Sequence, residues 1–277
     1  MKEPRARVRL PRRIEPGVRP RAVAGSGLTC LVLFAGATEW IGVDVSSGAV
    51  LRSRPDEAQK FVHAQTSDGY LKVTRFDVVT VSLAGDDETI DPARPEAISI
   101  TDAPVYVGRP RLRPVRRLLR ELASPERPGT SLLSSWGPSI AYTDLDGSHQ
   151  SVAIVETSPR QLALSARVDG TVVASVEWSG ISQEVPIIDP LAVRALGNSS
   201  GPLSKGPLVE ALGFRPSYLI CALGRVREGH APKMVAAVLP RRIPGRGKKQ
   251  VRALLREGPG GEILGHRPAE RDESVTP

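Results

Sequence analysis

The stretch QLALSARVDGTVVASVEW, residues 161–178, gives the clearest indication of the fold class. Asp169 and Gly170 stand between two runs rich in β-branched and small apolar residues, a pattern typical of a tight β-hairpin turn. Residues 39–54, with a turn at 46–48, and residues 139–156 have the same order of strand, polar turn and strand. Three such hairpins predict a protein rich in antiparallel sheet.

Short helices complete the predicted fold class. In DPLAVRALG (189–197), Asp189 is suited to the N-cap, Pro190 to the first turn and Gly197 to the end of the helix. GPLVEALG (206–213) has the same arrangement of breakers around an apolar centre. Together with the hairpins, these helices predict an α+β, β-rich protein.

One further helix is predicted within PVRRLLRELASP, residues 114–125. Pro114 suits a first helical turn, and Pro125 disfavours the helical conformation at Ser124. Apolar residues recur at a helical spacing along one face, and arginines occupy the other. We expect the apolar face, Val115, Leu118, Leu119 and Leu122, to pack inward and the basic face, Arg116, Arg117 and Arg120, to point outward.

The predicted elements divide into two β-rich modules, residues 26–124 and 130–258, each closing with a leucine-faced basic helix. A basic flexible arm, 1–25, precedes them, and a disordered tail, 259–277, follows. VRRLLRE (115–121) resembles VRALLRE (251–257), and EWIG resembles EWSG 138 residues later, which suggests an internal duplication. A second register, offset by about 100 residues, pairs GVDVSSG with YTDLDGS, so the duplication stays a hypothesis.

Positive charge is concentrated in three segments. Residues 1–25 carry a net +6, residues 109–122 carry +5 and residues 241–257 carry +6, whereas the whole chain is only +8. The remainder is therefore acidic, at −9. Such segregation indicates contact with an anionic partner, although arginines that face water or the protein's own acidic body would give the same composition.

We expect a non-catalytic cytoplasmic interaction or scaffold protein that uses these arginine-rich segments to bind an acidic protein partner. Nucleic acid is the second partner class, but the basic segments lack interleaved aromatic residues for stacking on bases. The oligomeric state is left open. The candidate contact residues are Arg116, Arg117, Arg120, Arg241, Arg242, Arg246, Lys248, Lys249 and Arg252.

Two stretches, IGVDVSSGAVLRSR and AYTDLDGSHQSVAIVE, resemble the phosphate loops of the actin, sugar-kinase and heat-shock ATPase superfamily. The resemblance implies a two-lobed nucleotide-binding fold, with Asp44 and Asp144 in the place of the family's magnesium-handling aspartates. The family's loops are glycine-rich just after the aspartate, whereas this chain has Ser46 and Asp146 there. Polar hairpin turns are the other interpretation. The alternative nucleotide site comprises Asp44, Ser46, Ser47, Asp144, Asp146 and Ser148.

No other motif indicates chemistry. The 144–155 stretch fails the calcium-loop pattern because valines occupy its ninth and twelfth positions, and the four histidines are scattered. We therefore expect no cofactor and no metal, and lean against an enzyme. No run of 18 apolar residues occurs, so no membrane span is expected. Cys30 and Cys221 lie in apolar runs and are interpreted as buried thiols of a reducing cytoplasm.

Overall fold

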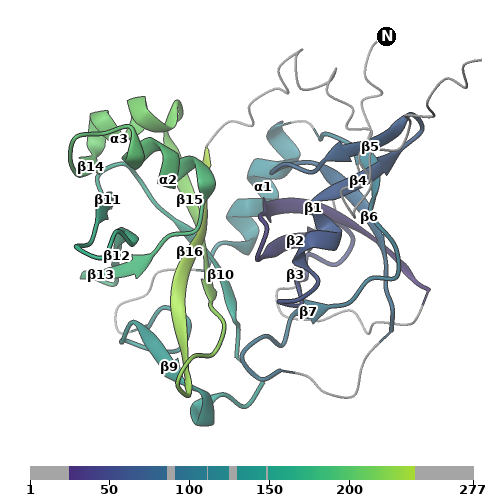
Figure 1. Cartoon of the computed structure of the whole chain (residues 1–277), viewed down its shortest axis with the longest axis horizontal. Helices are drawn as coiled ribbons and strands as arrows, with labels where there is room; N and C mark the ends of the chain where they lie inside the picture. Colours follow the sequence, from purple (N-terminus) through teal and green to yellow (C-terminus); the bar gives the residue numbers. More distant parts are fainter. Residues whose placement is uncertain (1–24, 86–90, 111, 125–129, 148, 241–277) are drawn as a thin grey trace, which may run out of the picture.

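The computed structural model describes residues 25–85, 91–110, 112–124, 130–147 and 149–240. Almost all of the predicted basic arm, the helix predicted at 251–257 and the predicted tail lie outside the described residues. The fold is α+β and β-rich, as the sequence predicts, with three sheets and three α-helices among the described residues (Figure 1).

The first sheet has eight strands in the order β5-β4-β8-β6-β1-β2-β3-β7. Most neighbours are antiparallel, but β3 pairs with β7, and β4 with β8, in parallel. A short 3-10 helix, η1 (Ala58–Phe61), precedes β4. The strands are β1 (Gly27–Ala35), β2 (Trp40–Asp44), β3 (Val50–Ser53), β4 (His63–Thr66), β5 (Gly69–Lys72), β6 (Val78–Ser82), β7 (Ala97–Ile98) and β8 (Val105–Gly108).

The central strand β1 is apolar on both faces because each face lines a different core. Cys30 and Val32 join a cluster enclosed by the first sheet, together with the stacked rings of Trp40 and Phe61. Leu31 and Leu33 point the other way, into a cluster shared with the second half of the chain. This explains why residues 28–34 read as a continuous apolar run.

The second half contains two four-stranded sheets, β10-β15-β16-β9 and β13-β12-β11-β14. They enclose a third apolar cluster together with helices α2 (Pro190–Gly197) and α3 (Lys205–Leu212). The 3-10 helix η2 (Tyr142–Asp144) follows β9. The strands are β9 (Ser139–Ala141), β10 (Val152–Glu156), β11 (Leu162–Ala166), β12 (Val172–Trp178), β13 (Ile181–Pro186), β14 (Leu203–Ser204), β15 (Pro216–Leu223) and β16 (His230–Pro240).

The predicted turns at 46–48 and 169–170 and the predicted helix caps are confirmed, but the third predicted hairpin, 139–156, is wrong, because β9 pairs with β16 and β10 pairs with β15, at opposite edges of their sheet. Gly48 and Gly170 have positive φ in the turns of the β2–β3 and β11–β12 hairpins. The Asp189 carboxylate accepts a hydrogen bond from the Leu191 amide at the start of α2, and Gly213 caps α3 in the left-handed conformation. These features follow from short-range chemistry, so sequence is enough to find them.

The duplication is not confirmed. Trp40 of EWIG begins strand β2, whereas Trp178 of EWSG ends strand β12, so the two matching stretches occupy different places in their hairpins. The other matching pair cannot be compared, because residues 251–257 lie outside the described part of the chain. The module boundary between residues 124 and 130 stays a prediction.

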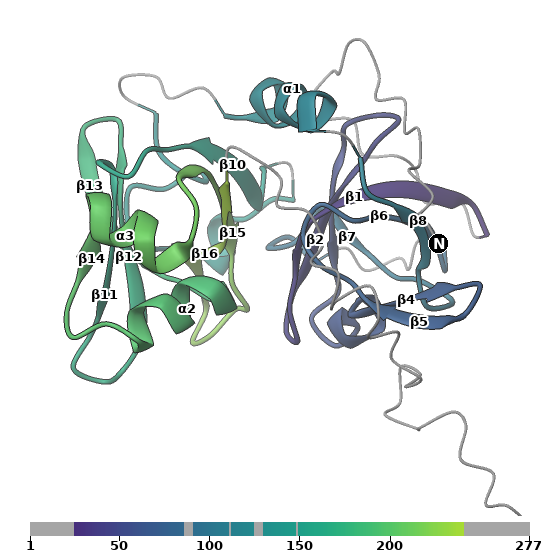
Figure 2. The same ribbon diagram turned by 90° about the horizontal axis from the view of Figure 1, so that it is seen from above.

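Helix α1 (Leu112–Leu122) lies over the junction between the two halves (Figure 2). It begins two residues before Pro114, which still falls within the first turn. Val115, Leu118 and Leu119 are almost fully buried in a cluster with Leu31 of the first sheet and Ile220 of the second. The predicted inward face of this helix is therefore confirmed, and it contacts both halves at once.

A buried ionic network also crosses the junction. Arg52, which is completely buried, donates from Nε and Nη2 to the two oxygens of Glu39, each at 2.8 Å. Its Nη1 reaches the Ser151 hydroxyl at 3.0 Å and its Nη2 reaches the Leu223 carbonyl at 2.6 Å. The guanidinium of a first-sheet residue thus binds two strand regions of the second half.

Neighbouring groups complete the network. Arg94 donates to Glu39 at 3.1 Å, and burial beside the Arg52 charge lowers the pKa of Arg94. The Ser151 amide donates to Glu96 at 2.8 Å, and its hydroxyl donates to the same carboxylate. Arg52 and Arg94 thus share the buried Glu39, and the half-buried Glu96 joins the network through Ser151. Buried charge is tolerated where it is paired and hydrogen-bonded in this way.

A second link joins the halves through Arg75. Its guanidinium donates to the Val238 carbonyl at 2.6 Å and to the buried Asp189 carboxylate at 2.7 Å. Asp189 also accepts a hydrogen bond from the Val238 amide at 2.8 Å. The residue that caps α2 thus also fixes strand β16 and binds the first half of the chain.

Leu119→Ala should destabilise the protein by about 2–5 kcal/mol, because it opens a cavity where α1 meets both halves. Chemical unfolding should show this loss, whereas the exposed neighbour change Arg120→Ala should shift the free energy of unfolding by less than about 0.5 kcal/mol. Equal effects of the two changes would contradict the placement of α1.

Arg52→Met should cost about 3–5 kcal/mol of stability, because it leaves Glu39 buried with a single cationic partner. The matched control is Lys60→Met, which removes the exposed ion pair with Glu57 and should cost less than about 1 kcal/mol. Urea unfolding of both variants measures the difference, and a near-neutral Arg52→Met would show that the network does not hold the junction.

Candidate functional site

The basic face of α1 is the first candidate site. Arg116 and Arg120 are exposed, one turn apart, and Arg117 is partly exposed beside them. Arg117 lies 3.6 Å from Glu121 on the same helix. To the other described residues, the side chains of Arg116 and Arg120 make no hydrogen bond or ion pair that the structure records. We call these three residues the arginine face.

The arginine face differs from the arginines of the junction in how its charge is used. Arg52, Arg94 and Arg75 are paired with buried carboxylates at the junction. Carboxylates at the junction therefore neutralise these internal arginines, whereas Arg116 and Arg120 of α1 are exposed. The other predicted contact residues, Arg241, Arg242, Arg246, Lys248, Lys249 and Arg252, lie outside the described residues.

The Asp44 turn forms a closed set of hydrogen bonds. The buried Asp44 carboxylate accepts from the amides of Ser46 and Ser47 at 3.2 and 3.0 Å, and from their hydroxyls at 2.5 and 2.6 Å. The Gly48 amide donates to the Asp44 carbonyl. This is the arrangement expected of a polar hairpin turn, and the carboxylate is already satisfied by its own loop.

Asp144 and Asp146 of the alternative nucleotide site follow strand β9, which belongs to a different sheet from Asp44. Asp144 ends η2 and is exposed, and Asp146 follows two residues later, 3.6 Å from the His149 ring. Ser148 lies outside the described residues. Asp44, by contrast, ends strand β2 of the first sheet. No group of three or more metal-ligating side chains gathers among the residues that the structure describes.

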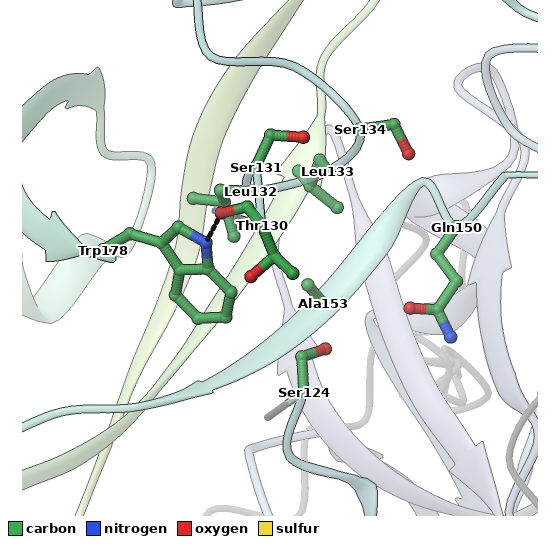
Figure 3. Close-up of a pocket in the computed structure, with 9 residues that line it drawn as sticks. All are labelled: Ser124, Thr130, Ser131, Leu132, Leu133, Ser134, Gln150, Ala153 and Trp178. Atoms are coloured by element: carbon green, nitrogen blue, oxygen red, sulfur yellow. Dashed lines mark hydrogen bonds between the residues drawn. The ribbon is translucent and has the colours of Figure 1, made fainter. Parts of the chain in front are cut away.

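A pocket of about 280 Å³ lies at the C-terminal end of α1 and was not predicted from the sequence. Figure 3 shows Trp178, Thr130 and Leu132 on one side, Ser134 and Gln150 on the other, and Ala153 and Ser124 between them. Leucine, alanine and the indole supply apolar surface, and hydroxyl and amide groups supply polar contacts. Its lining residues come from four separate parts of the chain, so no local sequence signal could reveal it.

The pocket wall formed by residues 130–135 is held by specific contacts. The Thr130 carbonyl accepts from the Trp178 indole at 2.8 Å and from the Ser179 hydroxyl at 3.1 Å. Leu133 and Ser134 both have positive φ, at 51° and 62°. Adjacent non-glycine residues in this conformation carry backbone strain, which the surrounding contacts must overcome.

Lys233 of strand β16 also holds this wall in place. It is almost fully buried on β16, and its ammonium group donates to the Ser135 carbonyl. Burial lowers the pKa of Lys233 to about 8, against a smaller opposing effect of Cys221. Burial likewise raises the pKa of the Cys221 thiol to about 12. Cys30 and Cys221 are free and buried, as the sequence predicts.

The buried Lys233 makes the stability of the protein depend on alkaline pH. Between pH 8 and about 10.5 the unfolded lysine keeps its proton while the folded lysine loses it, so unfolding takes up a proton. The free energy of unfolding of the wild type, relative to Lys233→Met, should therefore rise with pH across this window. Thermal or chemical unfolding at several pH values measures it, and parallel curves would contradict the lowered pKa.

The comparisons with known proteins do not identify a family. No family model matches the chain, and no curated protein matches it. Among solved structures, a crystal structure of the tetrameric p202 HIN2 is similar over 77% of this chain and 95% of that chain, at 6% identity and a TM-score of 0.26. Such a low score carries no argument about fold or function. No helix within the described ranges is long and apolar enough to cross a membrane.

Proposed function

We propose that this protein is a binding module that holds an acidic polypeptide against the arginine face of α1. The observation that carries the proposal is that the two faces of this helix lie in different surroundings. Its apolar face is buried at the junction of the two halves, while Arg116 and Arg120 point outward. A helix fixed in this way presents its arginines from a rigid support, which lowers the entropy lost on binding.

An acidic protein partner is favoured over the protein's own acidic body. The buried carboxylates of Glu39 and Asp189, and the half-buried carboxylate of Glu96, are engaged with the arginines and backbone of the junction. On α1 itself, the ion pair recorded is that between Arg117 and Glu121. Guanidinium groups bind carboxylates through paired hydrogen bonds, so an exposed row of arginines suits glutamate and aspartate side chains.

An acidic polypeptide is also favoured over single-stranded nucleic acid. Binding of bases requires aromatic surfaces beside the cationic groups. The large exposed aromatic residues of the described chain, Trp136 and Tyr142, flank strand β9, whereas the arginines stand on α1 over the junction (Figure 1). The arginine face therefore offers charge without a stacking platform.

The test compares Arg116→Gln/Arg117→Gln/Arg120→Gln with a control that removes the same charge elsewhere. Glutamine keeps helix propensity. Arg160→Gln/Arg194→Gln/Arg215→Gln is the control, since these three residues are exposed in the second half. Binding of a labelled oligo-glutamate peptide is measured by fluorescence anisotropy. The α1 variant should bind about tenfold more weakly, because each exposed ion pair contributes up to about 1 kcal/mol, and the control should bind like the wild type.

Duplex DNA and single-stranded RNA serve as competing probes at low and moderate salt. Nucleic-acid binding through α1 would appear as tighter binding of these probes than of oligo-glutamate, with a steep loss of affinity as salt increases. That outcome, or equal binding by the two triple variants, would overturn the proposal.

A further inference from the structure

The pocket lies at the C-terminal end of α1, the helix that carries the arginine face. Arg116 and Arg120 are four residues apart, a spacing that places their side chains on one face of α1. α1 ends at Leu122, and Ser124, two residues further on, lines the pocket. Its amide donates to the Ile154 carbonyl at 2.7 Å, which fixes the exit of α1 beside strand β10. The first residue of the pocket lining, Ser124, is therefore four residues along the chain from Arg120 of the arginine face.

The pocket has the size and lining to hold one side chain. At about 280 Å³ it lies at the lower limit of the usual size range of small-molecule sites, about 300–1,000 Å³. Leu132, Leu133, Ala153 and the indole of Trp178 provide apolar contacts for an aliphatic group. Ser124, Thr130, Ser131 and Gln150 are suited to hydrogen bonding with the backbone of the segment that carries it.

We infer that the arginine face and this pocket form a composite site for an extended acidic peptide that inserts one aliphatic side chain. The arginine half of this inference rests on the proposed function. Arg116 lies six residues before the end of α1, about 9 Å of helical rise, and Ser124 lies two residues beyond that end, at most about 7 Å further. An extended peptide covers about 16 Å in five residues. The site therefore selects a peptide whose aliphatic residue lies within about five residues of a pair of carboxylates.

The conformation of the wall supports a preformed site. Positive φ at Leu133, Ser134 and Ser179 concentrates strained backbone around the pocket. The Thr130 carbonyl is held by Trp178 and Ser179, and the Ser135 carbonyl by Lys233. Because folding has already fixed this wall, a peptide side chain enters without having to order it.

The experiment uses two peptides with the same pair of glutamates and either leucine or alanine three residues away. Both are titrated against the full-length protein by fluorescence anisotropy. The wild type should bind the leucine peptide about tenfold more tightly, since the larger side chain buries more apolar surface. Ser131→Phe, at the half-buried lining, and Ala153→Leu, which fills the floor, should both bind the two peptides equally, at the affinity of the wild type for the alanine peptide.

The arginine variant separates the two claims. Arg116→Gln/Arg117→Gln/Arg120→Gln should weaken both peptides while preserving the preference for leucine. Equal binding of the two peptides by the wild type, with loss of both in the arginine variant, would overturn the pocket and leave the proposed function standing. A leucine preference that survives both Ser131→Phe and Ala153→Leu would also overturn the pocket, and no binding of either peptide by the wild type would overturn both claims.

Discussion

The bidentate pair between Arg52 and Glu39 is the interaction on which the rest of the structure depends. A completely buried guanidinium is tolerated only where its donors are satisfied, and here they are satisfied partly by Ser151 and Leu223 of the second half. The first sheet cannot keep this charge buried without the second half in place. The ionic network therefore favours one relative position of the two halves, which apolar packing alone would define less sharply.

The packing of helix α1 depends on this relative position of the two halves. Its leucines need a surface made by both halves, because the apolar cluster that receives them combines Leu31 and Val43 of the first sheet with Ile154 and Ile220 of the second. A helix packed on such a joint surface is ordered only when the junction is formed. The orientation of its exposed arginines thus depends on contacts far away in the sequence, including the Arg75–Asp189 link.

The sequence predicts the features that depend on neighbouring residues. Alternating apolar strands, the Asp169–Gly170 turn, the Asp189 cap and the leucine spacing of α1 are all local, and each is present in the structure. The role of Arg52 could not be predicted, because its partners lie up to 171 residues away. The pocket could not be predicted for a similar reason, because its lining residues come from separate parts of the chain. Its left-handed residues Leu133 and Ser134 are also not glycines, the residue type that usually marks this conformation in a sequence.

The location of the proposed site has a thermodynamic consequence. The arginine face belongs to the helix that covers the junction, and the pocket wall includes Ala153 of β10, next to the Ile154 that contacts α1. A partner that binds only the folded arrangement stabilises it in proportion to the saturation of the site. Since the site disappears when α1 leaves the junction, the binding energy acts on the same contacts that join the halves. In the proposed function, binding of the partner and the contact between the two halves would therefore be coupled through a single helix, because the buried arginines hold the junction on which the exposed arginines of α1 depend.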